Sequence, residues 1–513
     1  MRFKKPLWVM LVLTILTIFI NLGDIPLLDP DEPVYGETPK EMIMFNDYIS
    51  PRIYGEFWYD KPPMYYWLVA GAYKLLGINE FATRVPSALL AVICVSVVYY
   101  MTAKLFDQRT GIISGVVLAT SLEFFYLAKA AVTDMTLTLF LTVSLFCFFR
   151  RKYYMFYLFS GLATLTKGPI GLFPGIIVII WLAVTHRFAE IRRMKLIQGI
   201  MVWLLVVMPW YGAMYAIHGM DFINGFIGIN NILRFATPEH VETAGWYFFI
   251  PVLLLGFFPW SSLLIPAITA AVKARTTANH GILSFLLVWA AFIFLFFSIS
   301  STKLVTYILP MFPALAVIVG WYISSCWEDW RLTGQRLIWP IVLTIVALLL
   351  IGAIIKGSTL IPGVATGGLV GLAIVLGMMP ILVWWFLSRR NVEKAFWGQA
   401  LMMVAVSVLL FNIILPPVAA GLHTREIARQ FVSIYDGKTP VYIMKFMRPG
   451  FAFYANMYGL EMRTDKDISS VIATTDTAYL IIQQSDYQLL SNAEKGQLTL
   501  VTYLNDKLIL LKR

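Results

Sequence analysis

Charged residues and cysteines are both scarce in this sequence of 513 residues. Asp, Glu, Lys and Arg together make up 13% of the chain, against roughly a quarter in a typical soluble domain, while hydrophobic residues make up 59%. So little charge indicates that lipid rather than water is the main solvent, which excludes an ordinary soluble protein. The three cysteines, Cys94, Cys147 and Cys326, lie within or beside apolar runs, so neither a disulfide framework nor a redox role is indicated.

The apolar residues gather in runs that approach or reach the roughly 17–25 residues needed to cross a bilayer. They predict thirteen spans, at 7–22, 83–104, 110–127, 132–150, 153–165, 168–185, 196–216, 246–271, 281–298, 303–323, 336–355, 366–387 and 397–416. The run at 153–165 is short and fits a partial or tilted span. The tyrosine-rich stretch at 64–77 is expected at the membrane interface. No small-residue cleavage site follows the first run, so it is predicted to stay as an anchor.

The distribution of Lys and Arg predicts the orientation of these spans. The net charge of +11 does not point to nucleic acid, because the basic residues form short clusters between apolar runs. With a cytoplasmic N-terminus, the cytoplasmic segments hold 19 Lys and Arg and the opposite loops hold 10. This bias follows the positive-inside rule. We therefore expect a multi-pass protein of the cytoplasmic (inner) membrane, with loop 24–82 and the C-terminus on the periplasmic side.

The composition changes from about His423 onward. Residues 423–513 contain polar and charged residues at the frequencies of a soluble domain. Strand-like runs occur at 441–445, 479–483, 498–504 and 508–511, and Asn505-Asp506 fits a hairpin turn between the last two. The sequence therefore predicts an all-α polytopic membrane domain at 1–422 followed by a small periplasmic α/β domain at 423–513.

Ionisable residues cluster on the outer face that this topology defines. Asp29, Asp31 and Glu32 follow the first span directly, and Lys61 lies among prolines and aromatic residues in the same loop. Further along the chain, the outer segments carry Asp134, Lys167, Arg234, Glu239, His240, Lys303 and Tyr307. Charges beside lipid are costly without a purpose, so their convergence on one face indicates a functional site. The simpler alternatives are a solvated loop for 24–82 and a helix N-cap for Asp134.

These residues carry a resemblance that runs from about residue 20 to 325. The chain resembles the 4-amino-4-deoxy-L-arabinose lipid A transferases and, more broadly, the protein O-mannosyltransferase-like glycosyltransferases of the GT-C class. The matching pieces, in chain order, are Asp31-Glu32 with Tyr35 and Glu37, Asp60-Lys61-Pro62-Pro63 with Tyr66-Trp67, Arg84-Val85-Pro86-Ser87, Thr133-Asp134, Leu165-Thr166-Lys167-Gly168-Pro169, Arg234-Phe235, Trp246-Tyr247 with Pro251, Gly256 and Pro259-Trp260, and the stretch from Lys303 to Pro310.

The resemblance implies an inverting transfer of a sugar from undecaprenyl phosphate to an extracytoplasmic acceptor such as lipid A. Asp31 and Asp134 take the family's catalytic acidic positions, with Glu32 as a near-motif candidate. The positions facing donor phosphate or substrate are Lys61, Arg234 and Tyr307, with Lys303, Tyr59 and His240 as near-motif candidates. Cations here would stabilise the phosphate charge that grows as the anomeric bond breaks. No spacing typical of metal ligands occurs, so the sequence gives no support for a divalent ion.

Two other functions compete with this interpretation. A related polyprenyl-phosphate-sugar transferase that moves mannose or another hexose to protein or surface polysaccharide would share the same motifs. A secondary transporter would place its charges near the bilayer midplane and show inverted repeats, and neither feature is visible. A non-catalytic scaffold leaves the aligned acidic and basic motifs without a role.

Overall fold

The computed structural model describes residues 12, 15–233, 237, 245–274, 279–328, 330, 334–357 and 365–512. These residues form two compact units, each built from several stretches of chain. The first unit comprises 1–20, 59–65 and 85–414, and the second comprises 21–58, 66–84 and 415–513. The predicted division at residue 422 stays a prediction, because the second unit joins the C-terminal residues to most of loop 24–82.

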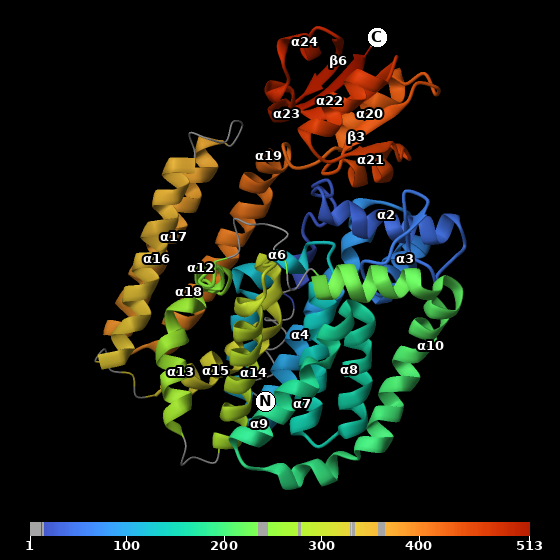
Figure 1. Ribbon diagram of the computed structural model, residues 1–513. Coiled ribbons are helices and arrows are strands. Elements are labelled where there is room, and N and C mark those ends of the chain that lie inside the picture. The colour runs from blue at the N-terminus through green and yellow to red at the C-terminus, as the bar shows by residue number, and fades with distance from the viewer. Residues whose placement is uncertain are drawn as a thin grey trace. The chain divides into compact units, whose positions relative to one another are not determined.

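The first unit is helical (Figure 1). Its long helices are α4 (Glu80–Leu105, which starts in the second unit), α5 (Gln108–Ala119), α6 (Leu122–Ala128), α7 (Asp134–Phe149), α8 (Tyr153–Lys167), α9 (Phe173–Val184), α10 (Leu196–Phe222), α12 (Phe249–Gly256), α13 (Leu264–Lys273), α14 (His280–Ile299), α15 (Phe312–Ser325), α16 (Ile338–Gly357), α17 (Thr366–Ser388) and α18 (Val392–Leu409). Short 3₁₀ or π segments lie between them at η1 (Gly168–Leu172), η2 (Phe188–Met194), η3 (Ile223–Leu233), η5 (Trp260–Leu263), η7 (Val305–Met311), η8 (Gly334–Leu337) and η9 (Leu410–Ile414).

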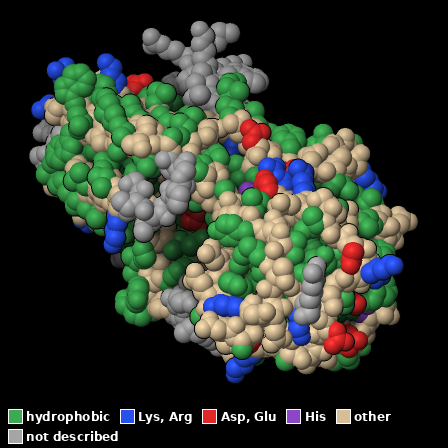
Figure 2. All heavy atoms as spheres, turned by 90° about the horizontal axis from the view of Figure 1, so that it is seen from above, with side chains coloured by type: hydrophobic (Ala, Val, Ile, Leu, Met, Phe, Trp, Pro, Cys, Tyr) green, Lys and Arg blue, Asp and Glu red, His purple; other side chains and the backbone are tan. Residues whose placement is uncertain are grey.

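Many of these helices are long and apolar enough to cross a bilayer, which confirms the polytopic membrane class. In the part of the chain that the structure describes, eight helices qualify, or up to ten if each of two bent pairs is one span. The predicted span at 246–271 is one bent pair, with an angle of 107° between its halves. Pro259 lies at this break and cannot donate a backbone hydrogen bond. Figure 2 shows one face of the molecule, on which hydrophobic side chains are widespread and charged ones are scattered.

The chain reverses direction between α8 and α9. Gly168 has a φ of +60°, a conformation that a residue with a side chain rarely adopts. The following turn folds back against α8, because Ser160 Oγ donates to the carbonyl of Gly171 at 2.6 Å. The helical stretch from residue 153 to 184 is therefore a reversing pair of helices. Lys167 is the last residue of α8 and lies directly before this reversal.

The C-terminal part of the second unit is a mixed sheet between helices. Its strands are β3 (Val441–Met444), β4 (Leu460–Met462), β5 (Ala478–Gln483), β6 (Leu498–Leu504) and β7 (Lys507–Lys512), in the order β4-β3-β5-β7-β6. Strand β3 pairs in parallel with β4 and β5, whereas β7 is antiparallel to β5 and β6. Its helices are α19 (Leu415–Ala419), α20 (Arg425–Ile434), α21 (Arg448–Ala455), α22 (Asp465–Thr474), α23 (Gln484–Leu489) and α24 (Asn492–Lys495).

Alternating side chains give this sheet two buried faces. Ile481 and Ile509 pack with α20 and α21 on one face, whereas Leu480 and Leu510 pack with α22 on the other. Successive strand residues point to opposite sides, so two apolar faces require nearly continuous apolar strands such as β5. The predicted small α/β domain is confirmed, with four of the five strands at the expected places.

Loop 24–82 has more regular structure than expected from the sequence. It contains α2 (Asp31–Met44), a hairpin of β1 (Arg52–Ile53) and β2 (Glu56–Phe57), and α3 (Met64–Leu76), which corresponds to the tyrosine-rich stretch expected at the interface. Within the second unit, α2 packs against α21. Lys40 Nζ donates to the carbonyls of Ala452 at 2.9 Å and Phe453 at 3.2 Å. These contacts make the N-terminal loop and the C-terminal sheet domain one packed body.

Candidate functional site

A cavity of about 490 Å³ in the first unit is lined by two of the predicted site residues, Lys61 and Tyr307. Its lining combines polar and apolar side chains, as expected of a site for an amphipathic ligand. Its polar lining is Asp60, Lys61, Lys167, Asn230, Asn231, Ser300, Thr302 and Tyr307. Its remaining lining is Pro169, Ile170, Leu172, Phe173, Ile176, Phe226, Ile232, Phe296 and Phe297.

Two ion pairs supply the charge at this cavity. Lys61 Nζ lies 2.8 Å from Asp60 Oδ1, and the two side chains are only 14% and 12% exposed. Lys167 Nζ lies 2.7 Å from Asp134 Oδ1, joining the end of α8 to the start of α7. Asp134 lies in the first turn of α7, where the helix dipole favours a negative charge. Each lysine thus has an acidic partner beside the cavity.

Tyr307 and Lys303 come from the segment around η7. The Nζ atom of Lys167 lies 4.8 Å from the centroid of the Tyr307 ring, within the range of a cation–π contact. Lys303 is buried and donates to the carbonyl of Ser300 at 2.5 Å. Tyr307 therefore lies in the cavity wall beside Lys167, whereas Lys303 stands behind the wall and holds Ser300, which is itself a lining residue.

Tyr59 supports the wall formed by η3. Its ring packs edge-on against His218 and Phe222, and its carbonyl accepts from Asn230 Nδ2 at 3.1 Å. Gly225 lies so close to the Tyr59 ring that a Cβ atom there would be 2.9 Å from it. This close packing positions Asn230 in the cavity wall. Arg234 and His240, which follow η3 along the chain, lie outside the described residues.

The predicted acidic residues Asp31 and Glu32 belong to the second unit, at the start of α2. Glu32 accepts two hydrogen bonds from Arg84, at 2.9 Å and 2.6 Å, and a third from the backbone N–H of Leu28. Arg84 also donates to the carbonyls of Leu22, Ile25 and Pro26. Such a buried, bidentate pair fixes the chain before α2. The structure therefore gives Glu32 a clear architectural role.

Other buried carboxylates lie within α2 and just before it. Glu37 is fully buried and forms an ion pair of 2.8 Å with Lys40. Burial raises the pKa of Glu37 to about 7, with Lys40 opposing the rise and Glu41 adding to it. Burial also raises the pKa of Asp29 well above its usual value. Since neither Glu37 nor Asp29 lines a described cavity, we assign these carboxylates to the packing of the second unit.

Sequence reasoning gave no role to Lys167 or Asp60 and did not single out Asn230 or Asn231. Lys167 was placed only among the ionisable residues of the outer face and in a motif, and Asp60 only in a motif. One signal was available for Lys167, since it is a lysine inside an otherwise apolar stretch on the same predicted face as Asp134. Chemically, two lysines, a tyrosine hydroxyl and two asparagines can bind an anionic group, while the aromatic side chains beside them can take up a hydrocarbon chain.

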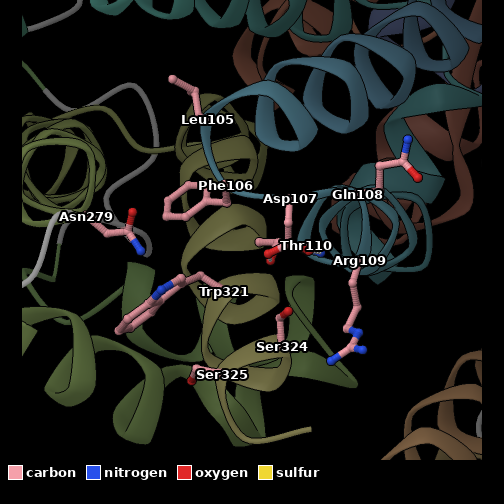
Figure 3. Close-up of a pocket in the computed structure, with 10 residues that line it drawn as sticks. All are labelled: Leu105, Phe106, Asp107, Gln108, Arg109, Thr110, Asn279, Trp321, Ser324 and Ser325. Carbon is pink, nitrogen blue, oxygen red and sulfur yellow. Dashed lines mark hydrogen bonds between the residues drawn. The ribbon is translucent and has the colours of Figure 1, made fainter.

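A second cavity of about 490 Å³ contains none of the predicted site residues (Figure 3). It lies where α4 ends, α5 begins and α15 ends. Its lining is Leu105, Phe106, Asp107, Gln108, Arg109, Thr110, Asn279, Trp321, Ser324 and Ser325.

For metals, no group of three or more His, Cys, Asp or Glu side chains that could hold an ion occurs among the described residues.

The chain is similar to known glycosyltransferases in sequence. The family of dolichyl-phosphate-mannose-protein mannosyltransferases matches residues 60–212. An uncharacterized protein of Aquifex aeolicus is 29% identical, over 88% of this chain and 87% of that protein. The undecaprenyl phosphate-alpha-4-amino-4-deoxy-L-arabinose arabinosyl transferase of Edwardsiella ictaluri is 30% identical over 63% of this chain. The alignment spans only 59% of that transferase.

The fold also matches solved structures over nearly the whole chain. The structure of ArnT from Cupriavidus metallidurans bound to undecaprenyl phosphate has a TM-score of 0.77 at 20% identity, and the match covers 98% of this chain and 97% of ArnT. The oligosaccharyltransferase of Archaeoglobus fulgidus is more distant, with a TM-score of 0.55 at 11% identity, covering 93% of this chain and 69% of that protein. The chain is therefore a multi-pass membrane protein that has the fold of ArnT and is similar in sequence, over 63% of its length, to an aminoarabinose transferase.

Proposed function

We propose that the protein transfers 4-amino-4-deoxy-L-arabinose from undecaprenyl phosphate to lipid A, with inversion at the anomeric carbon. The observation that carries this proposal is the cavity of the first unit, whose lining combines two lysines with aromatic and aliphatic side chains. A polyprenyl-phosphate sugar has a charged head and a long hydrocarbon tail, so it needs both kinds of lining. The arabinosyl transferases that the chain resembles take their donor from this class of lipid.

In the proposed reaction, an acceptor oxygen attacks the anomeric carbon of the sugar while the bond from that carbon to the phosphate oxygen breaks. Undecaprenyl phosphate leaves with one more negative charge. Lys61 and Lys167 stabilise that charge, and Tyr307 adds a neutral hydroxyl donor. A phosphate acceptor is already anionic, so it needs positioning rather than deprotonation. Lys61 and Lys167 are thus placed to assist departure of the leaving group.

Asp31 remains the proposed residue for the reacting sugar, as the resemblance implies. It is the first residue of α2 and lies directly before Glu32, whose pairing with Arg84 fixes this part of the backbone. A rigid backbone suits a side chain that must keep one geometry. Asp31→Asn preserves size and is expected to remove most turnover while leaving affinity for the donor nearly unchanged.

The proposed location is the inner membrane, with the N-terminus in the cytoplasm and the sheet domain in the periplasm. The uneven distribution of Lys and Arg supports this orientation. A cysteine introduced at Asp47 tests it, because Asp47 lies in the predicted periplasmic loop. An impermeant thiol reagent is expected to label it in intact spheroplasts, and absence of labelling would reverse the assignment.

Transfer by the purified protein in nanodiscs tests the proposed activity. Wild-type protein is expected to move the aminosugar from the undecaprenyl donor to lipid A, as mass spectrometry of the lipid A product would show. Lys61→Ala is expected to need more donor for the same rate, whereas Lys74→Ala, which removes a lysine whose ammonium stacks on Tyr48 in the second unit, is the matched control. No transfer by wild-type protein would refute the activity.

A further inference from the structure

The side chain of Asn230 has a fixed orientation in the wall of the cavity of the first unit. Its Nδ2 atom donates to the backbone carbonyls of Tyr59 at 3.1 Å and Gly225 at 3.0 Å. Carbonyl oxygens only accept hydrogen bonds, so the nitrogen of the amide must face both of them. Because both hydrogens of Nδ2 are then in use, Oδ1 is the atom of this amide that is left for a ligand.

The Oδ1 atom of Asn230 receives no hydrogen bond from the described part of the protein. The two bonds from Nδ2 are the hydrogen bonds that the structure gives this side chain. Asn230 is half-buried and lines the cavity. Water serves Oδ1 until a ligand displaces it, and that ligand then has to supply a hydrogen-bond donor of its own. The wall therefore favours a ligand with a hydroxyl or N–H group at this point.

The position of Asn230 in the wall indicates which part of the donor it meets. The carbonyl of Tyr59, which its amide holds, lies two residues before Lys61, the lysine assigned to the donor phosphate. Asn230 is therefore placed near the phosphate end of the donor. On the sugar ring, the hydroxyl group nearest to the phosphate is the one on carbon 2, beside the anomeric carbon.

We propose that Asn230 Oδ1 accepts a hydrogen bond from the 2-hydroxyl group of the donor sugar. This inference rests on the proposed function and adds a residue that orients the ring at its reacting carbon. As the bond to phosphate breaks, positive charge grows at the anomeric carbon and makes the neighbouring hydroxyl a stronger donor. A hydrogen bond to this hydroxyl then strengthens in the transition state, as in glycoside hydrolysis. The contact therefore contributes to turnover more than to binding of the donor.

Three donors on undecaprenyl phosphate test the proposal, namely 4-amino-4-deoxy-L-arabinose and its 2-deoxy and 3-deoxy analogues. The ratio kcat/KM is measured with the protein in nanodiscs, and each variant is compared with wild type for the same donor, which cancels the intrinsic reactivity of that donor. Asn230→Ala is expected to lose at least about 5-fold more kcat/KM with the parent and 3-deoxy donors than with the 2-deoxy donor, and mainly through kcat.

Two other variants separate this contact from support of the wall. Asn230→Ser has a shorter side chain whose hydroxyl can still donate to one of the two carbonyls, so it provides the same measurement if Asn230→Ala does not fold. Asn231→Ala is the matched comparison, because Asn231 lines the same cavity and its Nδ2 donates to the carbonyl of Phe226 at 2.6 Å. Any loss of kcat/KM in Asn231→Ala is expected to be equal for the three donors.

An equal loss with all three donors in the Asn230 variants would show that Asn230 only supports the wall, and would overturn the inference alone. A loss that spares the 3-deoxy donor rather than the 2-deoxy donor would overturn the assignment to the 2-hydroxyl. Failure of wild-type protein to use the parent donor would instead overturn the proposed function and the inference together.

Discussion

The two units of the protein contain ion pairs of nearly the same length but in different settings. In the first unit, Lys61 with Asp60 and Lys167 with Asp134 lie at a cavity, at 2.8 and 2.7 Å. In the second unit, Glu32 with Arg84 and Glu37 with Lys40 are buried at 2.6 and 2.8 Å and line no described cavity. The length of an ion pair therefore does not reveal its function. What distinguishes the pairs is whether a ligand can reach them.

This comparison predicts that loss of Arg84 damages the second unit rather than catalysis. Arg84→Met leaves Glu32 buried without its cation and three carbonyls without their donor. Breaking a buried pair in this way is expected to lower the free energy of unfolding by about 3–5 kcal/mol. Thermal unfolding in detergent measures this effect, with Arg52→Met as the control for a more exposed pair. If Arg84→Met had normal stability but no transfer activity, the pair of Glu32 with Arg84 would serve catalysis, and the contrast between the ion pairs of the two units would not hold.

The second prediction concerns the pH dependence of the second unit. Burial raises the pKa of Glu37 to about 7 in the folded state, from an ordinary value of 4.5. Between these values the folded state binds more protons than the unfolded state, so stability falls as the pH rises. The loss is on the order of 3 kcal/mol between about pH 4.5 and 7 and is complete above the folded pKa. Glu37→Gln is expected to remove this dependence.

Melting temperatures measured from pH 4.5 to 8 test this expectation. Glu37→Gln should match the wild type at the acidic end and exceed it at pH 8, because the amide cannot ionise. Glu56→Gln is the control, since Glu56 is an exposed carboxylate of β2 in the same unit. A wild-type profile in Glu37→Gln would show that another group determines the pH dependence.

Part of the fold could be predicted from the sequence and part could not. Alternating or continuous apolar residues reveal β3, β5, β6 and β7, because that pattern is local. Strand β4 was missed, since it is only three residues long and is defined by its pairing with β3 at the edge of the sheet. Short strands without a strong pattern depend on tertiary contacts that a local reading does not contain.

The candidate site was only partly predictable for the same reason, because it also depends on tertiary contacts. The sequence placed Asp31, Glu32 and Asp134 on one predicted face, and only the resemblance ranked Glu32 below the other two. Only the fold shows that Glu32 is held by Arg84, 52 positions away in the sequence, and that Asp134 is held by Lys167. Lys61 and Tyr307 could be predicted because they lie in long motifs. The partners of such residues could not, since partnership depends on how helices pack.

The third prediction asks whether Lys167 contacts substrate or only fixes Asp134. Lys167→Met is expected to lower kcat/KM for the undecaprenyl donor by a factor that corresponds to about 1.5–3 kcal/mol, the usual worth of a charge-assisted contact. It also leaves Asp134 without its cation, which destabilises the fold. The double variant with Asp134→Asn removes that unpaired charge. It is expected to recover thermal stability but not use of the donor. Recovery of both thermal stability and donor use would show that the ion pair of Lys167 with Asp134 is structural, like the ion pairs of the second unit.

The smallest expected effect concerns Tyr307, whose ring and hydroxyl serve different purposes. Tyr307→Phe keeps the ring near Lys167 and removes only a neutral hydrogen-bond donor to the phosphate. A hydrogen bond from a neutral donor to a charged group is worth about 1.5 kcal/mol at the low end, so donor use should fall roughly 10-fold. Tyr307→Leu also removes the cation–π contact, worth about 0.5–1 kcal/mol at an exposed site and more where water is excluded, and should fall further. Steady-state kinetics at limiting donor separates the two variants. Tyr307→Leu also loses the ring contact with Phe297, so thermal unfolding of both variants is measured beside the kinetics. Equal rates for Phe and wild type would show that the hydroxyl does not contact the donor, and would leave Tyr307 as support for Lys167.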